Sequence, residues 1–123
     1  MFWSKKKEQV ASVEWFKLSS VEQLDEIIEE SKTKPVLIYK HSTRCGVSSM
    51  AFDRLTRGWE NEYNDRLKPY YLDLIAHREV SDAVAQRFGI YHQSPQVILV
   101  KNGIATYDDS HMAISFSIIK GQL

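Results

Sequence analysis

The only cysteine of this chain, Cys45, lies in the segment His41-Ser42-Thr43-Arg44-Cys45-Gly46-Val47-Ser48. The apolar run Pro35-Val36-Leu37-Ile38-Tyr39 precedes this segment, and residues with helical spacing follow it. The thiol is therefore predicted to stand where a buried strand gives way to a helix N-terminus, whose N–H groups and partial positive charge favour the nucleophilic thiolate. A dithiol redox pair would need a second cysteine three residues later, but Ser48 stands there. The pattern indicates chemistry by a single thiol.

Five neighbours are predicted to support the thiolate, namely Thr43, Arg44, Gly46, Val47 and Ser48. Arg44 either adds positive charge and binds a carboxylate of a small thiol, or is a solvent-exposed loop arginine. Ser48 lies one helical turn from Cys45, where it either donates a hydrogen bond to the sulfur or satisfies the helix backbone. Thr43 is expected to cap the helix, with contact to the small thiol as the alternative.

The histidines give weaker signals. His41 follows the apolar run, and a histidine at a strand end is more often a structural hydrogen-bonding group than a base. His77, His92 and His111 are scattered and show no metal-ligand spacing, so no metal site is predicted.

The composition fits one domain with a core of its own. The chain has 123 residues, of which 43% are hydrophobic, and Lys+Arg and Asp+Glu are both 16. This balance predicts neither a nucleic-acid partner nor an acidic tail, and no apolar run is long enough for a membrane span. A lone thiol that must stay available favours a reducing compartment, so we expect a cytoplasmic protein, and a monomer. Residues 1–14, with the basic cluster Lys5-Lys6-Lys7, are predicted to be a solvated tail before a domain of residues 15–123.

Periodicity predicts alternating strands and helices. The expected strands span residues 15–18, 35–39, 67–75, 97–100 and 104–107, and the expected helices span 20–31, 47–64, 79–88 and 111–120. Ser19 and Glu22 have the spacing of a capping box, and Asn102-Gly103 is a hairpin signal. The order β-α-β-α-β-α-β-β-α predicts an α/β fold of the thioredoxin type, a central mixed sheet with helices on both faces. The cysteine falls at the carboxyl end of the second strand, where sites of such sheets lie.

Two stretches resemble known families. Phe88-Gly89-Ile90, Ser94-Pro95 and the run from Val97 to Gly103 resemble the region around the cis-proline of thioredoxins. This resemblance implies a cis Ser94–Pro95 bond facing Cys45, with the Ser94 backbone and Pro95 binding the substrate. The segment from Lys40 to Cys45, with Val47 and Ser48 after it, resembles YtxJ-type monothiol bacilliredoxins, and so does the pair Ser110-His111.

The bacilliredoxin resemblance implies a function. Such proteins act on mixed disulfides between bacillithiol and protein cysteines, so bacillithiol is the expected co-substrate, bacillithiolated proteins are the expected partners, and no tightly bound cofactor is expected. Cys45 would attack the bacillithiol sulfur, and a second thiol would then resolve the adduct because the chain has no second cysteine. Gly46 departs from the proline expected after the cysteine, and Cys45-Gly46-Val47-Ser48 also resembles the motif of monothiol glutaredoxins.

Other functions therefore stay open. A glutaredoxin-like protein would use glutathione or carry a [2Fe–2S] cluster, and Thr43 and Ser42 before the cysteine weakly suggest a one-cysteine peroxidase. A thioredoxin-like binding module without turnover is the remaining alternative. If Cys45 is not the nucleophile of an exchange reaction, the alternatives are a buried structural cysteine or the modified site of a sensor.

Overall fold

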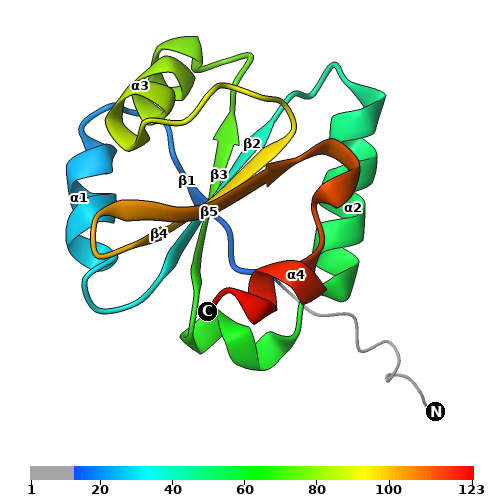
Figure 1. Ribbon diagram of the computed structural model, residues 1–123. Helices are drawn as coiled ribbons and strands as arrows, with labels where there is room; N and C mark the ends of the chain where they lie inside the picture. The colour runs from blue at the N-terminus through cyan, green and yellow to red at the C-terminus, as the bar shows by residue number, and fades with distance from the viewer. Residues whose placement is uncertain (1–12) are drawn as a thin grey trace.

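The apolar run after Pro35 forms the second strand of a five-stranded sheet in the computed structural model, which describes residues 13–123 (Figure 1). The strands are β1 (Phe16–Lys17), β2 (Val36–His41), β3 (Lys68–Asp73), β4 (Gln96–Lys101) and β5 (Ile104–Ser110). Their order in the sheet is β1-β3-β2-β4-β5. Strands β1, β3 and β2 are parallel, whereas β4 pairs antiparallel with both β2 and β5. This mixed sheet confirms the predicted fold class.

Helices cover both faces of the sheet. They are α1 (Gln23–Glu30), α2 (Gly46–Gly58), α3 (Arg78–Phe88) and α4 (Phe116–Gly121), with short 3-10 helices η1 (Asn61–Asp65) and η2 (His111–Ala113). Figure 1 shows α1 and α3 on one side and α2 and α4 on the other. Two buried clusters match these layers, since Ile38 of β2 packs with α1 and α3, whereas Leu37 and Tyr39 pack with α2 and α4. Alternate residues of β2 thus face opposite layers.

Several predicted boundaries were wrong. The helix predicted to run to residue 64 ends at Gly58, and the chain is extended at Trp59 and Glu60 before η1 begins. A Cβ at Gly58 would lie 3.4 Å from Cβ of Phe116, so this end of α2 lies against α4. The predicted last helix, 111–120, is divided into η2 and α4 by extended backbone at Ile114 and Ser115. The shared cause is packing between α2 and the C-terminal segment, which periodicity alone does not encode.

The start of α1 is held by a different residue from the one predicted. Glu22 makes no side-chain capping bond. Instead Gln23 Oε1 accepts the N–H groups of Ser19 and Ser20 at 2.7 and 3.0 Å, and its Nε2 donates to Lys17 O at 2.9 Å. The capping-box prediction was therefore wrong, because the helix begins later than residue 20 and the Gln23 side chain, one position after Glu22, reaches back to the free amides.

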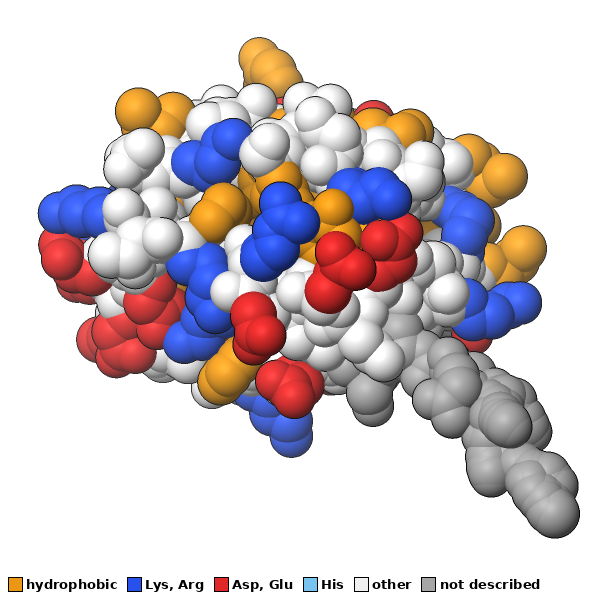
Figure 2. Space-filling view, turned by 90° about the horizontal axis from the view of Figure 1, so that it is seen from below, with side chains coloured by type: hydrophobic (Ala, Val, Ile, Leu, Met, Phe, Trp, Pro, Cys, Tyr) orange, Lys and Arg blue, Asp and Glu red, His pale blue; other side chains and the backbone are white. Residues whose placement is uncertain are grey.

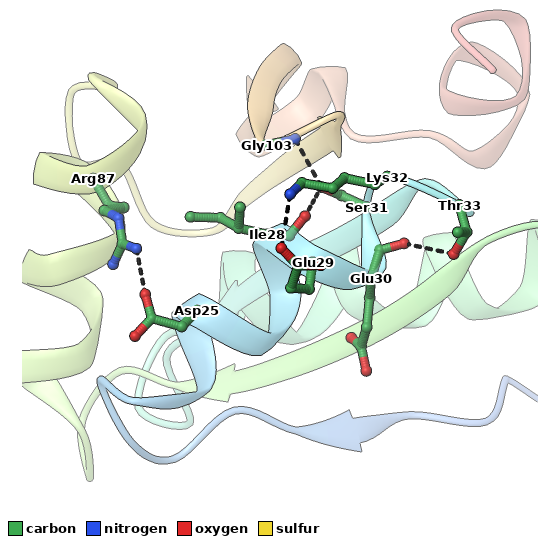
Figure 3. Close-up of polar contacts among 9 residues, drawn as sticks. All are labelled: Asp25, Ile28, Glu29, Glu30, Ser31, Lys32, Thr33, Arg87 and Gly103. Atoms are coloured by element: carbon green, nitrogen blue, oxygen red, sulfur yellow. Dashed lines mark hydrogen bonds and ion pairs between the residues drawn. The ribbon is translucent and has the colours of Figure 1, made fainter.

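The hairpin signal at Asn102-Gly103 is confirmed, and a further glycine ends a helix. Gly89 ends α3 with a φ of 65°, in the left-handed region that glycine adopts most easily. Asn102 and Gly103 both have positive φ, 53° and 77°, as a two-residue hairpin turn requires. The Gly103 N–H donates to Ser31 Oγ at 2.8 Å, which ties the hairpin to the end of α1 (Figure 3).

The end of the sheet away from Cys45 carries charged side chains of both signs (Figure 2). Figure 2 shows the end opposite to the carboxyl ends of the parallel strands, where Lys, Arg, Asp and Glu side chains are interspersed. There Lys68 donates to Glu30 Oε2 at 2.6 Å and its Nζ lies 4.4 Å from the centre of the Phe16 ring. This ion pair forms part of the lining of a hollow at this end of the sheet. Within residues 13–123, none of the helices combines the length and apolarity that a membrane crossing requires.

Candidate active site

Cys45 lies in the turn that connects β2 to α2. It is the N-cap residue of α2, with extended backbone (φ −114°, ψ 119°), and its side chain is half-buried. The turn is closed by the Cys45 N–H, which donates to Ser42 O at 3.2 Å, and the Cys45 carbonyl accepts the Ser49 N–H at 3.1 Å. The sequence placed the thiol correctly at a strand-to-helix junction.

The backbone after Cys45 offers free donors. Within the described residues, the N–H groups of Gly46 and Val47 have no hydrogen-bond acceptor, as expected for the first turn of a helix. The Cys45 side chain itself makes no capping bond to them in this structure. Both N–H groups are therefore available to a thiolate, and their role in stabilising it stays a prediction.

Ser48 is the most constrained residue of the site. It is fully buried, and its Oγ accepts the Ser42 N–H at 3.0 Å and lies 2.7 Å from His41 Nδ1. Burial lowers the pKa of His41, against a smaller opposing effect of Asp73, so the imidazole is neutral at pH 7, a state in which one ring nitrogen can accept a proton from a hydroxyl such as that of Ser48. Of the two roles weighed for Ser48, the described contacts therefore favour the structural one, and none of them joins Ser48 to Cys45.

Two β2 side chains lie under the turn. The Tyr39 hydroxyl donates to the Ser48 carbonyl at 2.9 Å, and burial raises the pKa of Tyr39 to about 12, so the phenol stays protonated. His41 is only 8% exposed and stacks on Tyr39, with Phe52 and Tyr71 also against its ring. This environment agrees with the expected structural role of His41 rather than with that of a base.

The flanking residues Thr43 and Arg44 are both exposed. The expectation that Thr43 caps the helix was wrong, because Cys45 is the N-cap and Thr43 lies two residues too early. Arg44 lies beside the cysteine with its side chain in solvent, a position from which it can meet a small anionic thiol. Its assignment to the substrate remains a prediction.

The strand on the other side of β2 brings the second predicted segment to the site. Gln96 pairs with Lys40, so Pro95, one residue earlier, lies beside the end of β2. The Ser94–Pro95 bond is cis, as the resemblance implied, and the Pro95 carbonyl accepts the His111 N–H at 3.2 Å. Ser94 Oγ is buried and has no hydrogen-bond partner within the described residues. The turn with Cys45 and the segment with Ser94 thus share the carboxyl end of β2.

The sequence reasoning missed three polar residues near this end of the sheet. Lys40 and Gln96 are buried among apolar strand residues, and Arg54 of α2 donates to the carbonyls of His111 and Ile114 at 3.1 and 3.0 Å. The signal for the first two was present, since Lys40 and Gln96 directly border the apolar runs 35–39 and 97–100. For metal binding, the described residues contain no group of three His, Cys, Asp or Glu side chains that could hold an ion.

Comparisons with known proteins agree with this geometry. A family model described as monothiol bacilliredoxin BrxC matches residues 16–119. A solved protein described as having a thioredoxin fold is 31% identical, with a TM-score of 0.74 over 88% of this chain and 92% of its own.

Two thioredoxins share the fold at lower identity. The thioredoxin of Malassezia sympodialis is 19% identical, with a TM-score of 0.64 over 90% of this chain and 87% of its own. The thioredoxin of Trypanosoma brucei brucei is 15% identical, with a TM-score of 0.65 over 97% of this chain and 94% of its own. The family match and the thioredoxin fold establish a thiol–disulfide redox role, and the chain belongs to the monothiol bacilliredoxin BrxC family.

Proposed function

We propose that this protein removes bacillithiol from protein mixed disulfides, with Cys45 as the nucleophile. The observation that carries the proposal is a single half-buried cysteine at the start of α2 in a chain that belongs to the monothiol bacilliredoxin family. The thioredoxin fold provides an open sheet end at which a protein substrate can approach this thiol.

The reaction is a thiol–disulfide exchange without net oxidation. The Cys45 thiolate attacks the bacillithiol sulfur, the bond between bacillithiol and the client sulfur breaks, and the client leaves as a thiolate that takes up a proton. A disulfide between Cys45 and bacillithiol remains. A second thiol then attacks this adduct, because Ser48 occupies the position from which a second cysteine would resolve it.

The neighbouring residues have proposed roles in this exchange. The N–H groups of Gly46 and Val47 stabilise negative charge on the sulfur, and Arg44 attracts a carboxylate of the small thiol. The backbone of Ser94 pairs with the client beside Cys45. We further propose that the protein acts as a monomer in the cytoplasm, where a lone thiol stays reduced.

Intact mass spectrometry tests the proposal. The reduced protein and its Cys45→Ser variant are each mixed with a bacillithiolated single-cysteine client, and separately with the glutathionylated form of that client. We expect one bacillithiol to move to the wild-type protein only, with release of the reduced client. Transfer of glutathione in place of bacillithiol would assign the protein to glutathione, and no transfer of either would refute exchange through Cys45.

A further inference from the structure

A fully buried lysine lies one residue before the active-site segment. The side chain of Lys40 is 0% exposed and lies on the α1/α3 side of the sheet, opposite to Tyr39 and His41. Its Nζ donates to the Ser81 carbonyl of α3 at 3.3 Å and lies 3.2 Å from His92 Nδ1. Within residues 13–123, no carboxylate lies at ion-pair distance from it.

The chemistry of this contact fixes the state of the histidine. An ammonium group has donors only, so His92 Nδ1 accepts and the imidazole is neutral with its proton on Nε2. Burial and the charges of Lys40 and Arg78 lower the pKa of His92, against Asp82, which raises it. Burial lowers the pKa of Lys40 to about 8, with Asp82 acting in the opposite direction, so the amine is mainly charged at pH 7. The contact is therefore present at neutral pH.

A second buried polar side chain holds the same segment. Gln96 is 1% exposed and lies directly across from Lys40 on β4, so both side chains are on one face of the sheet. Its Nε2 donates to the Tyr91 carbonyl at 3.0 Å, and its Oε1 accepts the Gln93 N–H at 3.4 Å. Three consecutive residues, 91–93, are thus bound by two strand side chains, directly before Ser94 and Pro95.

Burial of the Lys40 charge lowers folding stability, and the fold does not require a charge at this position. A buried charge without a carboxylate partner is unfavourable, and an apolar residue of similar volume at such a position is often neutral or stabilising. Lys40 and Gln96 do, however, fix the path of residues 91–93, which lead to the carboxyl end of β2. Cys45 lies in the turn that follows this strand end.

We propose that Lys40 and Gln96 are positioning residues that hold segment 91–95, through His92 and the backbone of Tyr91 and Gln93, in the place where the client docks beside Cys45. The inference rests on the proposed function, since it assigns the docking site of the same exchange reaction. It predicts that loss of these contacts weakens client binding and leaves the reactivity of the thiol unchanged.

Single-turnover transfer of bacillithiol from the client, measured against client concentration, separates these effects. In Lys40→Met we expect the half-saturating client concentration to rise about tenfold, the scale of one lost hydrogen bond to a charged group. The limiting rate and the alkylation rate of Cys45 by iodoacetamide without client should stay within about twofold, because the His41–Ser48 network lies on the other face of the sheet. The thermal midpoint should not fall.

A matched pair at His92 distinguishes positioning from packing. Asn presents Oδ1 near the place of Nδ1 and can accept from Lys40, so His92→Asn should retain client binding, whereas His92→Phe should lose it. An unchanged half-saturating concentration in folded Lys40→Met, or equal losses in both His92 variants, would overturn the inference.

A second substrate keeps the two proposals distinguishable. A peptide whose cysteine carries thionitrobenzoate reacts with any nucleophilic thiol, because Cys45 forms a disulfide with the peptide and releases thionitrobenzoate. The rate with this peptide is divided by the rate with dithiobis(nitrobenzoate), the small symmetric disulfide that releases the same thionitrobenzoate. This ratio reports docking of the peptide alone. If the wild type transfers no bacillithiol, the proposed function fails, and an unchanged ratio in Lys40→Met would separately refute the positioning role.

Discussion

Ser48 is expected to be the residue of the site whose truncation costs most stability. In Ser48→Ala, the Ser42 N–H and His41 Nδ1 lose their shared partner, while the bond from Tyr39 to the Ser48 carbonyl remains. An unsatisfied buried polar group costs about 1–3 kcal/mol, so we expect the free energy of unfolding to fall by about 2–4 kcal/mol. That is a large share of the roughly 5–15 kcal/mol typical of a domain.

Urea unfolding followed by far-UV circular dichroism measures this loss as a shift in midpoint at constant slope. Ser49→Ala is the matched control, because Ser49 is the next residue of α2 and is exposed, and it should stay within about 0.5 kcal/mol of wild type. Ser48→Cys under reducing conditions should also lose stability, since a thiol is a weak donor and acceptor.

The result that would refute this reasoning is a Ser48→Ala midpoint equal to that of Ser49→Ala. The hydrogen bonds of Ser48 would then contribute nothing net, and the turn before Cys45 would be held by its backbone alone. A lower slope of the unfolding free energy against urea concentration in Ser48→Ala would instead show a change in the unfolded or native ensemble. The two variants would then be compared by thermal unfolding.

Three further outcomes are expected. Gly46→Pro should raise stability by about 0.4–1 kcal/mol, measured by urea unfolding, because Cys45 already has the extended backbone that precedes proline and no heavy atom lies within 4 Å of a Cβ at Gly46. Because burial lowers the pKa of His41 from 6.5, the folded state binds fewer protons than the unfolded state; stability should therefore fall as pH drops below about 6.5, and less steeply in His41→Asn. Gly103→Ala should cost about 1–2 kcal/mol in thermal unfolding, because φ is 77° and a Cβ would lie 3.2 Å from Ile28 Cγ2, whereas Gly121→Ala, with open space, should not.

The fold was predictable because its signals are local. The run from Val36 to Tyr39, the turn glycines Gly89 and Gly103, and the helical spacing between them each depend on short-range geometry. Alternation of strand and helix then restricts the topology to parallel pairing with crossovers, followed by a hairpin. Element ends were less predictable, as Gln23 and Gly58 show, because they depend on which side chain reaches a free amide or meets another helix.

The sequence by itself determined that the chain has one cysteine, that this cysteine stands at a strand-to-helix junction, and that no second cysteine of the chain could pair with it. These follow from residue identity and spacing along a few turns of chain. Only the tertiary structure decided that Ser48 is bound by Ser42 and His41, and that Lys40 contacts His92 across 52 residues of sequence. Such partners come together through sheet register and helix packing, and no local pattern encodes which distant atom a buried polar group will meet.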